Sequence, residues 1–143
     1  MKAFRTCERY FTPAGRIIIG AFFVLAGVGK VFDIAGTAAY IESVGLPAGT
    51  FLAIVAILIE VGFGGMLLIG LKARYAALGL ALFTFIASLL FHTEDIARDM
   101  VQQTMFMKNM AIMGGLLFIA AHIGAPCCTT PAHKHDSNPT PTL

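Results

Sequence analysis

Four long apolar segments set the pattern of hydrophobic and polar positions along the chain. They cover residues 15–33, 51–71, 75–92 and 108–124. Each is close in length to the roughly 20 residues with which an α-helix crosses the hydrocarbon core of a bilayer. None shows the alternation with a period of two that is typical of a half-buried β-strand. The pattern therefore predicts an all-α integral membrane protein, built as a bundle of four transmembrane helices.

The segments between the spans predict how the helices are connected. Residues 34–50 contain Gly45 and Pro47, which favour a turn, and residues 71–75 (Leu-Lys-Ala-Arg-Tyr) form a charged hairpin. Residues 93–107 begin polar and become amphipathic. We expect short helices in the membrane interface between spans 1 and 2 and between spans 3 and 4.

Composition divides the chain into three parts. Residues 1–14 form a basic N-terminal segment, residues 15–125 the four-helix membrane domain, and residues 126–143 a flexible tail rich in Cys, His and Pro. A basic segment before an apolar span also begins a secretory signal peptide. Three more spans follow here instead of a cleavage site and a soluble domain, which favours a retained helix.

The distribution of Lys and Arg predicts the orientation in the membrane. In the four-span arrangement only Arg98 falls clearly on one side, and Lys30 and Lys108 lie near helix ends. The opposite side carries Lys2, Arg5, Arg9, Arg16, Lys72, Arg74 and Lys134. By the positive-inside rule, we expect both termini to be cytoplasmic.

The composition supports surroundings of lipid and excludes some other partners. The chain is 57% hydrophobic and 13% charged, with a mean hydropathy of +0.81. Soluble domains are about 45–50% apolar and about 25% charged. A net charge of +2, without a basic run interleaved with aromatics, gives no reason to expect nucleic-acid binding. The expected partner is the lipid bilayer.

A few ionisable side chains interrupt the apolar spans. A carboxylate near the bilayer centre, such as Glu60, costs roughly 2.5–3.5 kcal/mol on insertion scales, so it needs a partner or a proton. Ala56, Glu60 and Gly64 share one helical stripe, which predicts that Glu60 faces the bundle. At about 1.5 Å of rise per residue, other polar groups lie at a similar level in the outer half of the membrane. We predict an intramembrane polar pocket lined by Lys30, Glu60, His92, Lys108 and Asn109.

Three interpretations of these residues stay open. In the first, the residues are structural. Lys30 forms a buried ion pair with Glu60 that fixes the helix register, or it pairs with Asp33 along its own helix. His92 and Lys108 are then interfacial anchors. In the second, the residues line a ligand-binding or redox pocket. In the third, they serve ion passage, although four helices with so few polar residues make a poor water-filled pore.

Four potential metal ligands stand close together after the last span. They are Cys127, Cys128, His133 and His135. Thiolates and imidazoles bind zinc or copper, but the spacing C-C-x4-H-x-H is not that of a zinc finger. The alternative is an acylated or inert cysteine pair on a flexible tail. A metal site in the tail and a plain juxtamembrane tail both remain hypotheses.

Glycine and polar motifs follow one another in a fixed order through the membrane domain. They are Gly27-x-Gly29-Lys30, Tyr40-Ile41-x-x-x-Gly45-Leu46-Pro47, Glu60-x-Gly62-x-Gly64-Gly65, Leu68-x-Gly70-Leu71-Lys72-x-Arg74, His92, and Phe106-x-Lys108-Asn109-x-Ala111-x-x-Gly114-Gly115. Over about residues 12–125 this set resembles the DoxX family of small four-helix bacterial membrane proteins. The resemblance implies a four-helix bundle in the bacterial inner (cell) membrane, with the five predicted pocket residues at recurrent family positions. The tail from Cys127 is not part of the family pattern.

The resemblance implies a function only in broad terms. Some members of the family are linked to membrane oxidoreductase assemblies in thiol and oxidative stress, and a related branch to quinone-coupled thiosulfate oxidation. We therefore favour a redox-linked, quinone-interacting subunit or accessory, in which the basic and amide side chains are hydrogen-bond donors and Glu60 carries protons. The chain has no flavin, haem or iron–sulfur motif, so electrons would come from a partner oxidoreductase or a bound metal.

Two other functions stay open, and the residues assign no catalytic role. One is a non-catalytic membrane scaffold or assembly subunit, in a complex or a homo-oligomer. The other is transport of a small solute or a metal, for which an inverted repeat would be evidence.

Overall fold

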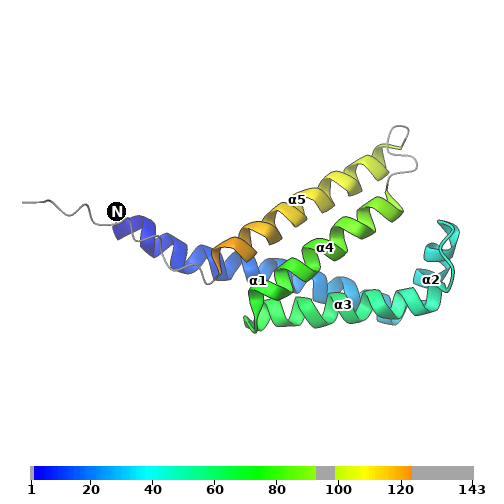
Figure 1. The fold of residues 1–143 in the computed structure, drawn as a ribbon, viewed down its shortest axis with the longest axis horizontal. Helices are drawn as coiled ribbons and strands as arrows, with labels where there is room; N and C mark the ends of the chain where they lie inside the picture. The colour runs from blue at the N-terminus through cyan, green and yellow to red at the C-terminus, as the bar shows by residue number, and fades with distance from the viewer. Residues whose placement is uncertain (1, 93–98, 124–143) are drawn as a thin grey trace, which may run out of the picture.

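The computed structural model of the chain describes residues 2–92 and 99–123, with side chains placed from Tyr10 onward. Over these residues the chain forms five helices and no strand (Figure 1). In chain order they are α1 (Lys2–Phe32), α2 (Ile34–Ser43), α3 (Gly49–Ile69), α4 (Ala73–Phe91) and α5 (Met100–His122). The prediction of an all-α protein is confirmed.

Four of these helices are long and apolar enough to cross a membrane. They are Tyr10–Phe32 within α1 and the whole of α3, α4 and α5. This confirms the prediction of four spans. The short helix expected between the first two spans is α2.

Two helices extend beyond the predicted spans. α1 begins at Lys2, well before residue 15, and carries Pro13 inside it. α5 begins at Met100 rather than at residue 108, so residues 100–107 continue the fourth span and do not form a separate interfacial helix. No Gly or Pro interrupts that part of α5, so the backbone has no reason to break there. Residues 93–98 of the expected interfacial segment lie outside the described residues.

Two helix pairs make up the bundle, with α1 packed along α3 and α4 packed along α5. Gly20 and Gly64 face each other in the first pair: a methyl group added at Gly20 would lie 3.0 Å from the carbonyl oxygen of Gly64. Small residues of this kind let helix backbones approach closely in lipid, where packing rather than the hydrophobic effect drives association. Across the described residues, contact between the pairs is made by α3 with α4 and, more briefly, by α1 with α5.

The two pairs are packed together at the end of the bundle where α3 turns into α4, which we call the closed end. Leu67, Leu80 and Leu116 are fully buried there, among the small side chains of three alanines in the first turns of α4. A methyl group added at Gly79 of α4 would lie 2.6 Å from the ring of Phe63 on α3. Small residues thus bring α4 against α3 at this end.

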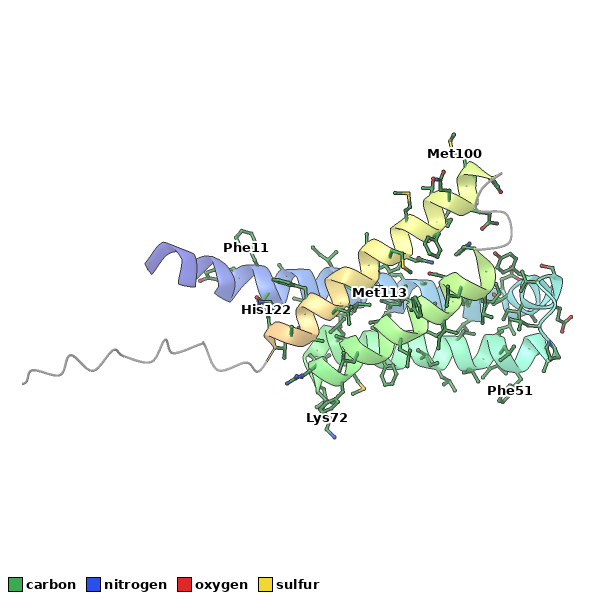
Figure 2. The ribbon with its side chains drawn as sticks, turned by 45° about the horizontal axis from the view of Figure 1, so that its top comes forward. Phe11, Phe51, Lys72, Met100, Met113 and His122 are labelled. Atoms are coloured by element: carbon green, nitrogen blue, oxygen red, sulfur yellow. The ribbon has the colours of Figure 1, made fainter. Side chains whose placement is uncertain are left out.

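Toward the other end, which we call the open end, the two pairs diverge, and α2 lies beside the start of α3 (Figure 1). Figure 2 places Phe51 and Met100 at the open end, and Lys72 and His122 at the closed end. The charged hairpin and the end of the fourth span therefore share one side of the bundle. This agrees with the predicted alternation of spans, while the cytoplasmic placement of that side stays a prediction.

The outside of the bundle is covered with large apolar side chains (Figure 2). Leu25 and Phe32 of α1 and Ile69 of α3 are among the many that are exposed. Patches of this extent on a soluble monomer would drive association or aggregation. The surface is instead that of a protein embedded in a lipid bilayer.

Candidate functional site

An ion pair between Lys30 and Glu60 joins α1 to α3 near the open end. The Lys30 Nζ lies 2.7 Å from Oε2 and 2.9 Å from Oε1 of Glu60. The Glu60 residue is only 6% exposed, whereas the Lys30 side chain is 31% exposed. The helices approach closely here because Gly27, one turn before Lys30, has no side chain: a methyl group there would lie 2.7 Å from Val61. Glu60 therefore faces α1 and not lipid.

The alternative partner of Lys30 has another role. The side chain of Asp33 caps α2, where its Oδ1 accepts the backbone N–H of Gly36 at 2.9 Å. Lys30 and Asp33 share one backbone hydrogen bond, from the Asp33 N–H to the Lys30 carbonyl at 3.2 Å. The direct contact of Lys30 with Glu60 is the geometry expected of a structural ion pair. Whether the pair also takes part in ligand binding depends on the space around it.

A cavity of about 520 Å³ lies beside this ion pair, between the diverging helix pairs. Its wall is mostly apolar, with residues from all five helices, the α2–α3 connection and the end of α4. The polar residues of the wall are Lys30, Thr37, Tyr40, Glu60, His92 and Asn109. The structure thus brings four of the five predicted pocket residues to one cavity.

Lys108 is the predicted pocket residue that the cavity wall does not contain. It is exposed, and its Nζ contacts the Sδ of Met105 on the same helix at 3.1 Å. Consecutive residues of an α-helix point about 100° apart, and at this position of α5 Asn109 is turned toward the cavity while Lys108 is turned away from it. The structure selects Asn109.

One side of the cavity is open through an apolar edge. Leu82, Ile86 and Leu90 of α4 follow one another at intervals of four residues, line the cavity, and are also 61%, 47% and 45% exposed. Half-buried apolar residues of α3, including Val55 and Ile59, also line the cavity. Because these helices span the membrane, this edge opens toward acyl chains.

α2 borders the cavity at the open end and contacts α4 through one aromatic pair. The rings of Tyr40 and Phe91 are stacked, with centroids 5.5 Å apart and planes at 20°, and both line the cavity. α2 is fixed to α3 by the Oε1 of Glu42, which accepts the backbone N–H of Gly49 at 3.2 Å. This stack links α2 to α4. Sequence reasoning missed Phe91, and it noted Tyr40 only as part of the family motif.

His92 directly follows α4, and its side chain contacts α5. Its Nδ1 lies 2.6 Å from the Oε1 of Gln102, which stands in the first turn of α5 and outside the cavity wall. The backbone N–H of His92 donates to the Ser88 carbonyl at 3.1 Å. Gln102 was not singled out from the sequence, since only the tertiary structure shows that it faces His92.

The candidate metal ligands of the tail lie outside the described residues. These are Cys127, Cys128, His133 and His135. The side chains described, those of residues 10–92 and 99–123, contain no group of three His, Cys, Asp or Glu able to hold a metal ion. A metal site in the tail therefore stays a prediction.

Comparison with known proteins identifies relatives of the chain. The DoxX family model matches residues 12–93. "Inner membrane protein YqjF" of Escherichia coli K12 is 40% identical over 105 residues, which cover 73% of this chain and 78% of that protein. "Inner membrane protein YphA" of the same organism is 30% identical over 108 residues, which cover 73% and 77% of the two chains. No solved structure matches this chain.

Proposed function

The chain belongs to the DoxX family and is a multi-pass protein of the inner membrane, and from this premise we propose that it binds a membrane-soluble quinone in the cavity. In this proposal the protein is a redox-linked subunit or accessory of a membrane oxidoreductase system. Electrons pass to or from the quinone through a partner oxidoreductase.

The observation that carries the proposal is the division of the cavity into a charged wall and an apolar edge. The Lys30–Glu60 pair lies at one wall, while exposed leucine and isoleucine side chains of α4 line the open edge. A quinone has the same division, with two polar carbonyls on its ring and an apolar tail. The volume of about 520 Å³ falls within the range of about 300–1,000 Å³ that is usual for small-molecule sites.

The polar wall offers groups suited to a quinone headgroup. Lys30 keeps one N–H beyond the two contacts it makes with Glu60, and the Tyr40 hydroxyl and the Asn109 amide can each donate. Reduction of a quinone also takes up protons, and Glu60 is the buried carboxyl group of this wall. The apolar edge then lets the tail remain among the lipids while the ring is bound.

Direct binding tests the proposal. A short-chain benzoquinone is titrated into purified protein in detergent micelles by calorimetry, and an azido-quinone is photo-crosslinked and located by peptide mass spectrometry. We expect crosslinks on α3 and α4, and His92→Ala and Asn109→Leu to weaken binding by about tenfold, since each removes one or more hydrogen bonds. Lys108→Ala, outside the cavity wall, is expected to bind like the wild type. No binding, or equal binding by all variants, would refute the proposal.

A non-catalytic scaffold or assembly subunit is the second candidate. It is favoured by the direct 2.7 Å contact of Lys30 with Glu60, because such a pair can fix the packing of two helices without any ligand. In that case substitutions in the cavity wall lower the amount of protein in the membrane, purified protein binds no quinone, and affinity purification recovers a defined partner.

A further inference from the structure

We propose that Gln102 is a positioning residue that holds His92 as its Nδ1–H tautomer, and that the cavity consequently prefers a quinol to the corresponding quinone. The tautomer follows from contacts within the chain alone. The preference for the reduced ligand rests on the proposed function and specifies which redox form of the ligand is bound more tightly.

The orientation of His92 begins at the start of α5. The side chain of Asp99 caps this helix, accepting the Val101 N–H at 2.8 Å, and so fixes the first turn in which Gln102 lies. The Oε1 of Gln102 lies 2.6 Å from the Nδ1 of His92. In this orientation of the Gln102 amide the contacting atom is a carbonyl oxygen, which only accepts, and in this proposal the proton of the contact therefore lies on Nδ1.

The proton on Nδ1 decides what His92 offers to a ligand. In a neutral imidazole with a proton on Nδ1, the other ring nitrogen, Nε2, is an acceptor. Gln102 lies outside the cavity wall and His92 is part of it. Gln102 therefore acts on a ligand only through His92, much as an outer hydrogen-bond partner sets the tautomer of a histidine that binds a metal.

The rest of the polar wall adds more acceptors than pure donors. Thr37 donates its hydroxyl proton to the Asp33 carbonyl at 2.8 Å, which leaves its oxygen as an acceptor. Both oxygens of Glu60 already accept from Lys30 and keep further lone pairs. With the Nε2 of His92 these make three accepting groups, against one pure donor, Lys30. Tyr40 and Asn109 can do either. A quinol brings two O–H donors and a quinone brings none, so this wall is matched to the quinol.

The tautomer is measured without any ligand. Protein labelled with ¹⁵N-histidine is examined by NMR in micelles at about pH 8, where an ordinary imidazole is neutral, and the His92 signals are assigned by their loss in His92→Ala. We expect the Nδ1–H form in the wild type and in Gln102→Glu, which keeps an accepting oxygen, and a shift toward the Nε2–H form in Gln102→Leu. Gln103→Leu, an exposed neighbour on α5, is the matched control. An Nε2–H signal in the wild type, or no change in Gln102→Leu, would overturn the positioning role.

The preference is measured by titrating the same short-chain benzoquinone in its oxidised and reduced forms under anaerobic conditions. We expect the wild type and Gln103→Leu to bind the quinol about tenfold more tightly, the effect of one hydrogen bond, and the ratio to fall toward one in Gln102→Leu. Equal affinities in the wild type, or a ratio unaffected by Gln102→Leu, would overturn the preference while leaving quinone binding intact. If neither form binds, the proposed function and the preference fail together, and the NMR result still decides the tautomer.

Discussion

The closed end and the open end of the bundle are built from the same four spans, yet one is packed solid and the other encloses a cavity. At the closed end α4 presents alanines, and Leu67, Leu80 and Leu116 fill the space between the helices. At the open end the same helix presents Leu82, Ile86 and Leu90, which line the cavity. Small side chains let two helices approach closely at the closed end.

This difference teaches where polar groups can be placed in a small membrane protein. At the closed end apolar side chains fill the interior and leave no space beside them for a ligand. At the open end the divergence of the pairs leaves space beside Glu60, and α1 supplies Lys30 as its partner. The polar wall and the cavity therefore occur together because the same divergence permits both.

The substitution with the largest expected effect on stability removes one charge at the open end. In Lys30→Met the Glu60 carboxyl stays buried without its partner, and breaking a buried ion pair in this way costs about 3–5 kcal/mol. We expect the free energy of unfolding to fall by about that amount in a denaturant titration of the protein in micelles. Lys108→Met, an exposed lysine of α5, should change it little.

The double variant Lys30→Met/Glu60→Leu sharpens this result. Replacing both charges with apolar groups removes the buried, unpaired carboxyl, so most of the lost stability is expected to return. Glu60→Leu alone should cost less than Lys30→Met, since the Lys30 side chain is already 31% exposed and its ammonium group can reach toward water. If Lys30→Met costs no more than Lys108→Met, the ion pair does not stabilise the open end.

A second test acts on close packing between α1 and α3. The methyl group of Gly20→Ala would lie 3.0 Å from backbone atoms of Gly64 and Leu68. Backbone cannot move aside as a flexible side chain can, so we expect a loss of about 1–3 kcal/mol in the free energy of unfolding. Gly29→Ala on the same helix meets nothing within 4 Å and should be neutral or slightly stabilising. Equal effects of the two substitutions would contradict the proposed close packing.

A third test removes the aromatic stack between Tyr40 of α2 and Phe91 of α4. Tyr40→Ala removes the stack with Phe91, which is worth about 0.5–1.5 kcal/mol beyond the burial of its area. We expect a small loss of stability, and faster association and dissociation of a quinone in stopped-flow measurements, because the open end is less restrained. Tyr40→Phe keeps the ring and should retain the wild-type association rate. Unchanged rates in Tyr40→Ala would show that the stack does not restrict access.

The smallest expected effect on stability comes from filling the cavity. Ala87 of α4 lines it, so the larger side chain of Ala87→Leu enters space that is free of protein atoms. We expect the free energy of unfolding to change by less than about 1 kcal/mol, with quinone binding lost. Ala111→Leu places the same side chain at an exposed position of α5 and should keep binding. Normal binding by Ala87→Leu would mean that the ligand site lies elsewhere.

The sequence alone determined the four spans and the inward face of Glu60, because both depend on local rules. Uninterrupted apolar length predicts a span in lipid, and the stripe shared with Ala56 and Gly64 predicts which side of one helix packs. The same rules misplaced the start of α5, since amphipathic character before residue 108 does not by itself end a helix. They also grouped Lys108 with Asn109, because depth along a helix was compared without the rotation between neighbours.

The tertiary structure decided which residues of different helices meet. The approach of α1 to α3 at Gly27 sets Lys30 against Glu60, the divergence of the two pairs creates the cavity, and the contact of α4 with α5 brings Gln102 to His92. These outcomes depend on the crossing angles and distances of whole helices, which are set by the sizes of side chains on both partners at once. The sequence pattern predicts which face of each helix packs against other helices, but not the angle at which two helices cross.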